Sequence, residues 1–392
     1  MIGSLQGLKV LDLSRVLAGP YCTMLMADLG AEVIKVEQPG IGDDSRAFAP
    51  FVGKESAYFM SLNRGKKSIC LDLKKEKDKE VLWELIKKCD IIVENFRPGT
   101  MEKLGFGYED IKPINPSIIY AAISGFGHTG PYSQLPAYDM IVQAMGGVMS
   151  ITGEQGRPPV RVGTSIGDIT AALFGTIGIL AALNVRNQTG QGQKIDVSML
   201  DSQVAILENA IVRYQTSGQA PKPLGTKHPS IAPFQAFPTK DYYVIVAVGN
   251  DSLWEKFCKI LDIEYLLIDP RFKTNNDRIG HVDELEKIIK QITITKTTDE
   301  WLEIIRAAGI PVAAINTIDK VVKDPQVLAR NMLVELVHPV AGKMIVPGNP
   351  IKLSLNPPVI ETPAPLLGEN TASVLQEFLG WDEKKAADFV SN

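Results

Sequence analysis

One strand–helix–strand stretch decides the fold class: LKVLDLSRVLAGPYCTMLMADLGAEVIKV, residues 8–36. The apolar run Leu8–Leu13 predicts a short buried strand, and Pro20 suits the first turn of a helix. We therefore predict a helix over Tyr21–Leu29 and a second strand over Glu32–Val36. Together these segments form one βαβ unit, which favours a parallel sheet with helices on both faces.

The same alternation of strand and helix signals continues well beyond this unit. The further segments that we predict are the strands Ser68–Leu71, Asp90–Val93, Ser117–Ile123 and Lys194–Ser198, and the helices Lys77–Cys89, Asp168–Val185 and Asp201–Tyr214. The helix Asp168–Val185 is almost wholly apolar, but glycines and threonines interrupt it. Burial on most sides explains this helix better than a membrane span does.

The pattern changes after a segment rich in proline and glycine, Ser217–Pro238, which we interpret as an ordered linker. A β run over Tyr242–Val248 follows, and after it come three helical segments and a short strand. This order is typical of a smaller α+β domain. The chain is thus α/β overall, with a second domain of different construction.

Composition narrows the class of protein. The 392 residues are 45% hydrophobic and 22% charged, as in a globular protein with a sizeable core. A net charge of −4 gives no excess for binding nucleic acid or an anionic membrane. The four cysteines are far apart without a CxxC pair, which indicates neither a zinc site nor a disulfide framework. The sequence has no signal-peptide pattern and no apolar run of about 18 residues, so we expect a soluble, cytoplasmic protein.

Several common kinds of active site are not predicted. A dinucleotide fold needs G-x-G-x-x-G after the first strand, but Ser14–Pro20 contains one glycine followed by a proline. No Walker lysine loop is present either. The four histidines lie outside any H-E-x-x-H or triad-like context, so we predict neither a metal site nor a serine hydrolase.

The most unusual carboxylate is Asp168, which follows Gly167 and enters the apolar helix. It could be a helix cap, since aspartate satisfies free backbone amides at an N-terminus. It could also be a poorly solvated and therefore more nucleophilic carboxylate in an apolar pocket. Two other stretches, Asn95–Gly99 and Pro136–Asp139, place polar groups at the end of a strand and before a helix. Taken singly, a solvated arginine and a turn aspartate explain them as well.

Taken together, these residues resemble the class III CoA-transferases, the group of the formyl-CoA and carnitine CoA-transferases. The matching pieces occur in order along nearly the whole chain: Val10–Leu13, Ala18–Pro20, Ala31–Glu37, Leu71–Lys74, Val93–Gly99, Ala137–Asp139, Gly146–Gly147, Gly167–Asp168, Thr189–Gln193 and Ala364–Glu369.

The resemblance implies an interlocked homodimer of ring-like subunits. Each subunit would have a Rossmann-like large domain built from both termini and a small α+β domain inserted between them. On this basis we expect the large domain over residues 1–216 and 331–392, the linker over 217–238 and the small domain over 239–330.

The resemblance also implies a covalent mechanism. Family members use an aspartate at the position of Asp168 as the nucleophile that attacks the thioester of an acyl-CoA. A mixed anhydride and then an aspartyl-CoA thioester would carry CoA from one carboxylic acid to another. The expected partners are an acyl-CoA and a carboxylic acid, with no permanently bound cofactor and no metal.

Carried over residue by residue, CoA binding falls on positions near the ends of the predicted strands. These positions are Val16, Ala18, Gln38, Leu71, Lys74, Asn95, Phe96, Arg97, Lys103, Ala137, Tyr138 and Asp139. Lys74, Arg97 and Lys103 are the cations that we expect near the phosphates of CoA.

The sequence departs from parts of the family. The formyl-CoA and oxalate enzymes carry glutamine at the place of Leu17 and a glycine-rich loop before a small-domain strand, where this chain has the shorter Gly225–Ser230 segment. We therefore expect a larger or less polar acid than oxalate. The α-methylacyl-CoA racemases share the fold but use a histidine in the stretch matching Pro136–Asp139, where this chain has Tyr138. A tyrosine with a pKa near 10 is a poor proton shuttle at neutral pH. A racemase and a catalytically silent acyl-CoA-binding protein remain the alternatives.

Overall fold

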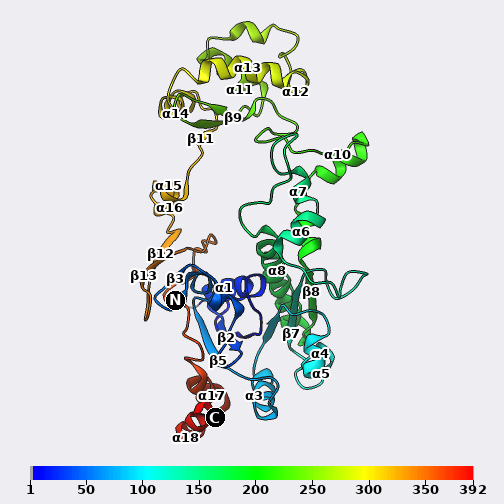
Figure 1. Cartoon of the computed structure of the whole chain (residues 1–392), viewed down its shortest axis with the longest axis vertical. Helices are drawn as coiled ribbons and strands as arrows, with labels where there is room; N and C mark the ends of the chain where they lie inside the picture. The colour runs from blue at the N-terminus through cyan, green and yellow to red at the C-terminus, as the bar shows by residue number, and fades with distance from the viewer. Residues whose placement is uncertain (1–2, 392) are drawn as a thin grey trace. The chain divides into compact units, whose positions relative to one another are not determined.

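The computed structural model describes residues 3–391. Its principal element is a six-stranded parallel sheet in the order β5-β2-β1-β6-β7-β8 (Figure 1). The strands are β1 (Lys9–Asp12), β2 (Glu32–Glu37), β5 (Lys66–Cys70), β6 (Ile91–Glu94), β7 (Ile119–Ser124) and β8 (Lys194–Ser198). Numbered along the chain, this is the 3-2-1-4-5-6 order of a Rossmann fold. The direction of the strand order reverses between β1 and β6, where such sheets bind their ligands at the carboxyl ends.

Helices cover both faces of the sheet because neighbouring strand residues point to opposite sides. Val10 packs with α1 (Ala18–Asp28) and α8 (Ile166–Thr189) on one face. Leu11 packs with α3 (Glu76–Ile86) and α17 (Thr371–Leu379) on the other. The C-terminal helix α17 thus completes a layer that the N-terminal half of the chain begins. The α/β fold class predicted from the sequence is confirmed.

By length and composition, α8 is apolar enough to cross a membrane. This differs from the prediction that the sequence contains no apolar run of such length. Half of the apolar window is buried, and α8 packs against α1, β7 and β8. Its small residues explain this close packing, since a Cβ at Gly175 would lie 2.8 Å from Ile123 of β7. One side of α8 is therefore packed in the core beside the sheet.

The predicted single helix over Asp201–Tyr214 is divided into two. The structure has α9 (Met199–Ala205) and α10 (Ala210–Ser217), separated by a segment in which Glu208 has a φ of +58°. A left-handed residue cannot continue a right-handed helix, so the chain turns here. The apolar pattern alone did not show this break.

The remaining elements around the sheet are short and lie between its strands or after the second unit. They are η1 (Asp44–Ala47), β3 (Phe51–Val52), β4 (Glu55–Ser56), α2 (Ala57–Leu62), α4 (Thr100–Leu104), α5 (Tyr108–Ile111), α6 (Asp139–Met145), α7 (Val148–Ile151), α16 (Pro325–Ala329), β12 (Leu333–His338), β13 (Gly342–Pro347) and α18 (Glu383–Ser391).

A second compact unit comprises residues 150–160 and 219–325, and the first comprises 1–149, 161–218 and 326–392. The second unit contains a three-stranded antiparallel sheet with helices packed on it. Its elements are β9 (Phe234–Pro238), β10 (Tyr243–Ala247), α11 (Asp251–Ile260), η2 (Glu264–Leu267), α12 (Asn275–Gly280), α13 (Val282–Thr293), α14 (Thr298–Ala307), β11 (Val312–Ala314) and α15 (Ile318–Val321). The second unit includes residues 150–160 and residues 219–238 of the expected linker, whereas residues 217–218 belong to the first unit. The domain boundaries expected from the resemblance stay a prediction.

Candidate functional site

The loop after β1 lies at the point where the strand order reverses. The side chain of Asn95, just beyond β6, forms hydrogen bonds with both backbone groups of Arg15 in this loop. Its Oδ1 accepts the backbone N–H of Arg15 at 2.8 Å, and its Nδ2 donates to the Arg15 carbonyl at 2.7 Å. Asn95 was predicted to contact CoA, but its amide group already fixes the loop that would lie beside the ligand.

The next residue, Val16, is held in an unusual conformation. Its φ of +68° is rare for a β-branched residue. The Asp43 carboxylate accepts the Val16 N–H at 3.0 Å, and the same carboxylate lies 2.8 Å from Lys35 Nζ. Lys35 in turn donates to the Ser14 carbonyl at 2.9 Å. Buried side chains therefore hold this loop in place, where a dinucleotide-binding loop would rely on glycines.

A buried ionic cluster lies beneath the loop. Lys66 Nζ is 2.9 Å from the Asp12 carboxylate, and Lys35 Nζ is 3.9 Å from it, with all three side chains fully buried. Burial alone would raise the pKa of Asp12, but Lys35, Lys66 and the hydrogen bond from Ser14 hold that pKa well below its usual range. Burial lowers the pKa of Lys66 to about 8. Asp12 thus stays ionised and compensates two buried cations.

Glu37 ends β2, where dinucleotide-binding proteins place an acid on the ribose hydroxyls. Here Arg46 donates to both carboxylate oxygens at 2.7 and 2.8 Å, and the Ser68 hydroxyl donates at 2.6 Å. The Asp43 backbone N–H donates as well, at 2.9 Å. The Glu37 carboxylate therefore accepts four hydrogen bonds from within the protein.

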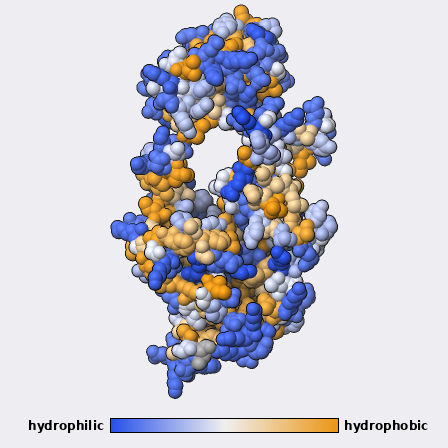
Figure 2. All heavy atoms as spheres, in the orientation of Figure 1, coloured by the Kyte–Doolittle hydropathy of each residue, from blue (hydrophilic) through white to orange (hydrophobic). Residues whose placement is uncertain are grey.

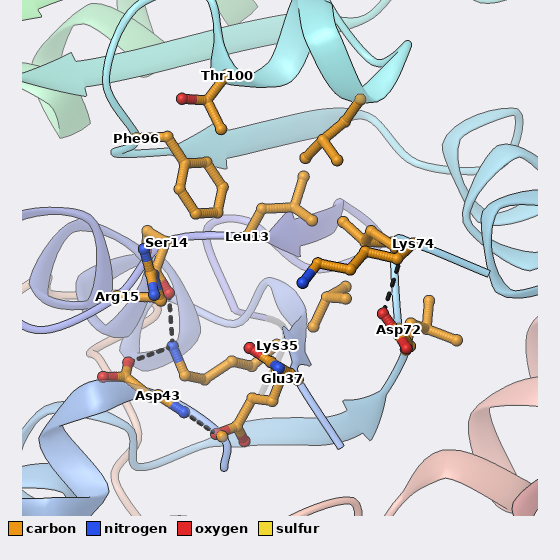
Figure 3. A pocket seen from close by; sticks show the side chains of 16 residues that line it. Leu13, Ser14, Arg15, Lys35, Glu37, Asp43, Asp72, Lys74, Phe96 and Thr100 are labelled. Atoms are coloured by element: carbon orange, nitrogen blue, oxygen red, sulfur yellow. Dashed lines mark hydrogen bonds and ion pairs between the residues drawn. The ribbon is translucent and has the colours of Figure 1, made fainter. Parts of the chain in front are cut away.

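A cavity of about 240 Å³ opens at the carboxyl ends of β1, β2, β5 and β6 (Figure 3). Four predicted CoA-binding residues line it, namely Gln38, Leu71, Lys74 and Phe96. Leucines form much of its wall, and the amino group of Lys74 points into it. An apolar cavity with a few charged groups is the usual form of a small-molecule site.

A second cavity, of about 150 Å³, shares Phe96 with the first. It is lined by Asn95, Arg97, Ala137 and Tyr138 among others. Tyr138 is 77% exposed, which is unusual for an aromatic side chain and leaves its ring open to a ligand. Eight of the predicted residues therefore line one or both of two adjoining cavities.

The other predicted contacts have different environments. Val16 and Ala18 lie in the loop and at the start of α1, and Lys103 lies on α4. Within residues 3–391 these three residues line neither cavity. Their role in CoA binding stays a prediction.

Asp168 lies in the first turn of α8, but another residue caps this helix. Asp139, at the start of α6, accepts the Gly167 N–H at 2.8 Å and the Gln143 amide at 2.7 Å. A Cβ at Gly167 would lie 2.7 Å from Val142 and 3.0 Å from Asp139, so only glycine permits this approach. Among residues 3–391 no group donates a hydrogen bond to the Asp168 carboxylate. The cap interpretation of Asp168 is therefore not what the structure shows.

The environment of Asp168 alters its acidity. Burial and the nearby Asp139 carboxylate raise the pKa of Asp168 to about 7. The half-buried Tyr58 of α2 lies in the same electrostatic environment, since burial, Asp168, Asp43 and Asp139 raise the pKa of its phenol to about 12. Tyr58 therefore keeps its proton and can donate a hydrogen bond. Sequence reasoning missed Tyr58, because only the fold brings α2 near α8.

His128, the histidine nearest in sequence to Tyr138, belongs to a different cluster. Its Nδ1 lies 3.0 Å from Lys194 Nζ, and its Nε2 lies 3.7 Å from the buried Glu94. Burial and the Lys194 charge lower the pKa of His128, which favours the neutral imidazole. The recorded partners of His128 come from β6 and β8, whereas Asp168 lies on α8.

Comparison with known proteins assigns the chain to a family. The profile of CoA-transferase family III matches residues 5–371, and the chain belongs to that family. Acetyl-CoA:oxalate CoA-transferase of Acetobacter aceti is 43% identical over 97% of this chain and 97% of its own length. Succinyl-CoA:glutarate CoA-transferase of Homo sapiens is also 43% identical, over 100% of this chain and 89% of its own.

A solved structure shares the fold across the whole chain. The crystal structure of a CAIB/BAIF family protein from Brucella suis has a TM-score of 0.87 and 38% identity. The match covers 96% of this chain and 100% of that one. The protein is thus an enzyme of the class III CoA-transferases, whose substrates are CoA thioesters.

Proposed function

We propose that this enzyme transfers CoA between an acyl-CoA and a carboxylic acid through a covalent intermediate on Asp168. The observation that carries the proposal is the division of roles between two acids. Asp139 accepts a backbone N–H at the start of α8, and the half-buried Asp168 carboxylate accepts no hydrogen bond within residues 3–391. A carboxylate with few hydrogen-bond donors retains more of its nucleophilicity.

The proposed reaction proceeds in four displacements. An Asp168 oxygen attacks the thioester carbon, the C–S bond breaks, and a mixed anhydride and CoA thiolate result. The thiolate attacks the Asp168 carbonyl carbon of the anhydride, releasing the donor carboxylate and leaving an aspartyl-CoA thioester. The acceptor carboxylate then displaces the thiolate to form a second anhydride. Finally the thiolate attacks the acceptor acyl carbon, giving the new acyl-CoA and free Asp168.

The two adjoining cavities support the assignment of the CoA site. Phe96 lines both of them, so a long ligand could occupy both around one aromatic side chain. Lys74 contributes a cation to the first cavity and Arg97 contributes one to the second. Two cations near an apolar wall suit the phosphates and the adenine of CoA.

The identity of the donor and acceptor acids is a separate question from the type of reaction. Relatives of equal identity are named for oxalate and for glutarate, so their names do not converge on one acid. Our preference for an acid larger than oxalate, based on Leu17, stays a prediction. The cytoplasmic location also stays a prediction.

The covalent intermediate can be trapped. Brief incubation with a panel of acyl-CoAs, followed by hydroxylamine, is expected to leave a hydroxamate on the peptide that contains Asp168. Because the nucleophile is the ionised carboxylate and its pKa is about 7, the yield should fall as the pH drops below 7. Peptide mapping by mass spectrometry measures both results.

Label on another acid, or no label with any donor, would contradict the covalent assignment. The racemase and the silent binder would then be separated by a further measurement. Solvent deuterium entering the α-carbon of an acyl-CoA without an acceptor acid would favour the racemase.

We also propose a homodimer, and the exposed side of α8 supports it. Leu173, Phe174, Ile177 and Leu180 of α8 are each at least 39% exposed, whereas Ala172 and Ile179 of the same helix are buried. On the face drawn in Figure 2, the first unit carries broad hydrophobic patches and the second unit is mostly hydrophilic. Contiguous apolar surface of this kind marks an interaction site in soluble proteins.

Sedimentation tests the dimer. The wild-type chain should sediment at twice its monomer mass of 42.8 kDa, and Ile177→Glu should shift it toward monomer because a charge would be buried in the interface. Ile268→Glu is the matched control, since Ile268 is 84% exposed and lies in the second unit. A wild-type monomer at micromolar concentration would overturn the dimer.

A further inference from the structure

We propose that Arg15 binds a phosphate of the acyl-CoA. In the ligand-free protein the Arg15 guanidinium forms an ion pair with Asp44, and the phosphate replaces Asp44 when the ligand binds. This inference rests on the proposed function, in which CoA is the ligand of the cavity at the sheet edge. It adds a cation that neither the sequence nor the comparison with relatives assigned to the site.

The position of Arg15 is the first argument. Arg15 lines the cavity together with Lys74 and Phe96. Figure 3 shows Arg15 and Lys74 on opposite sides of the cavity. Arg15 immediately follows Ser14 at the point where the strand order reverses between β1 and β6, which is the usual ligand position in such sheets.

The rigidity of its backbone is the second argument. Asn95 fixes both the N–H and the carbonyl of Arg15, and Asp43 fixes the N–H of Val16. The guanidinium itself lies over the Phe96 ring, 5.1 Å from its centre. An arginine whose backbone and ring contact are fixed loses less freedom when a ligand binds.

The weakness of its present partner is the third argument. The recorded ion pair of Arg15 is with Asp44, at 3.3 Å between NH1 and Oδ2, and the two side chains are 46% and 48% exposed. Exposed pairs of this kind contribute little stability. The neighbouring acids have other partners, since Asp43 pairs with Lys35 and Glu37 with Arg46. Asp44 can therefore release Arg15 at low cost, and a phosphate can form a bidentate contact in its place.

Two substitutions of opposite charge test the exchange. Arg15→Gln should raise the Kd for free CoA about ten- to hundredfold, because a hydrogen-bonded charge contact is lost. Asp44→Asn should lower the Kd by about two- to fivefold, because the competing anion is removed. Isothermal titration calorimetry with CoA measures both without requiring turnover. If the pair were only structural, both variants would weaken binding, and this result would overturn the proposal.

A matched control separates a local effect from a general one. Arg271 in the second unit also lies over an aromatic ring, 5.0 Å from the centre of Phe272, and pairs with the half-buried Asp269. Arg271→Gln should leave the Kd for CoA unchanged. An equal loss of affinity in Arg271→Gln would overturn the assignment to Arg15.

Dephospho-CoA identifies which phosphate Arg15 contacts. If Arg15 contacts the 3′-phosphate, Arg15→Gln and wild type should bind dephospho-CoA equally. If it contacts the diphosphate, the loss of affinity should persist with dephospho-CoA. Both outcomes support the proposal, whereas equal binding of CoA by Arg15→Gln and wild type would overturn it. That last result would leave the transfer reaction itself unaffected, since trapping on Asp168 tests the reaction separately.

Discussion

Asp168→Ala is expected to abolish CoA transfer, with kcat reduced on the order of 10⁴-fold or more, as removal of a covalent nucleophile does. The fold should persist, because Asp139 caps α8 and no group within residues 3–391 donates to the Asp168 carboxylate. Affinity for CoA should also persist, since Asp168 lines neither of the cavities that we propose for CoA. A turnover assay with an acyl-CoA and an acceptor acid, together with calorimetry, measures both quantities.

The stability of this variant gives an internal check. The folded protein raises the pKa of Asp168 from 3.8 to about 7, so it binds this proton more tightly than the unfolded chain. The ionised group therefore makes folding less favourable as the pH rises through that window. Asp168→Ala should be at least as stable as wild type at pH 8 in thermal unfolding.

The matched control is Asp201→Ala, because Asp201 occupies the same third position in the first turn of α9. It should keep full turnover. Substantial residual turnover in Asp168→Ala would contradict the nucleophile assignment, and loss of turnover in both variants would indicate a general effect on the helix starts.

Asp12→Ala is expected to lower the free energy of unfolding by about 3–5 kcal/mol, as breaking a buried ion pair does. The substitution leaves Lys66 and Lys35 buried without the carboxylate that lies 2.9 and 3.9 Å from them. It also removes the acceptor of the Thr23 hydroxyl and the Ser14 N–H. Urea denaturation monitored by circular dichroism measures the loss.

The double variant Asp12→Ala/Lys66→Met separates the unpaired charge from the lost contacts. It should recover part of the stability, because the buried ammonium group is removed together with its partner. A loss below about 1 kcal/mol in Asp12→Ala would place this cluster among weak ion pairs and contradict its buried environment.

The sequence alone predicted the strands of the sheet, but it did not predict the buried ion pairs that lie within and beside them. The apolar runs of β1, β2 and β6 define these strands, because buried parallel strands carry little but aliphatic side chains. The sequence does not indicate which acidic side chains neutralise Lys35 in the middle of β2. Asp12 and Asp43 lie near it only after β1 and the loop after β2 are placed.

In the candidate site, too, the sequence predicted some residues and the fold brought others together. Gly167 and Asp168 at the start of an apolar helix indicate an unusual carboxylate, and the sequence leaves open whether it is a cap or a nucleophile. In the structure the Asp139 carboxylate accepts the Gly167 N–H at the start of α8, and Asp168 accepts no such bond within residues 3–391. The nucleophilic role of Asp168 and the contact of Asp139 with CoA stay proposals. Tyr58 had no sequence signal, since a tyrosine in a short helix is common.

The environment of Glu37 bears on how the enzyme selects among the nucleotides of the cell. Adenine dinucleotides are recognised in similar sheets by an acid that accepts the ribose hydroxyls. Here the corresponding acid, Glu37, already accepts hydrogen bonds from Arg46, Ser68 and the Asp43 N–H. Val16 stands in the loop where dinucleotide-binding proteins have a glycine beside the pyrophosphate. The protein thus retains the strand order of a dinucleotide-binding fold while lacking its two recognition devices. We therefore expect adenine dinucleotides to bind poorly at this sheet edge, where we propose that CoA binds.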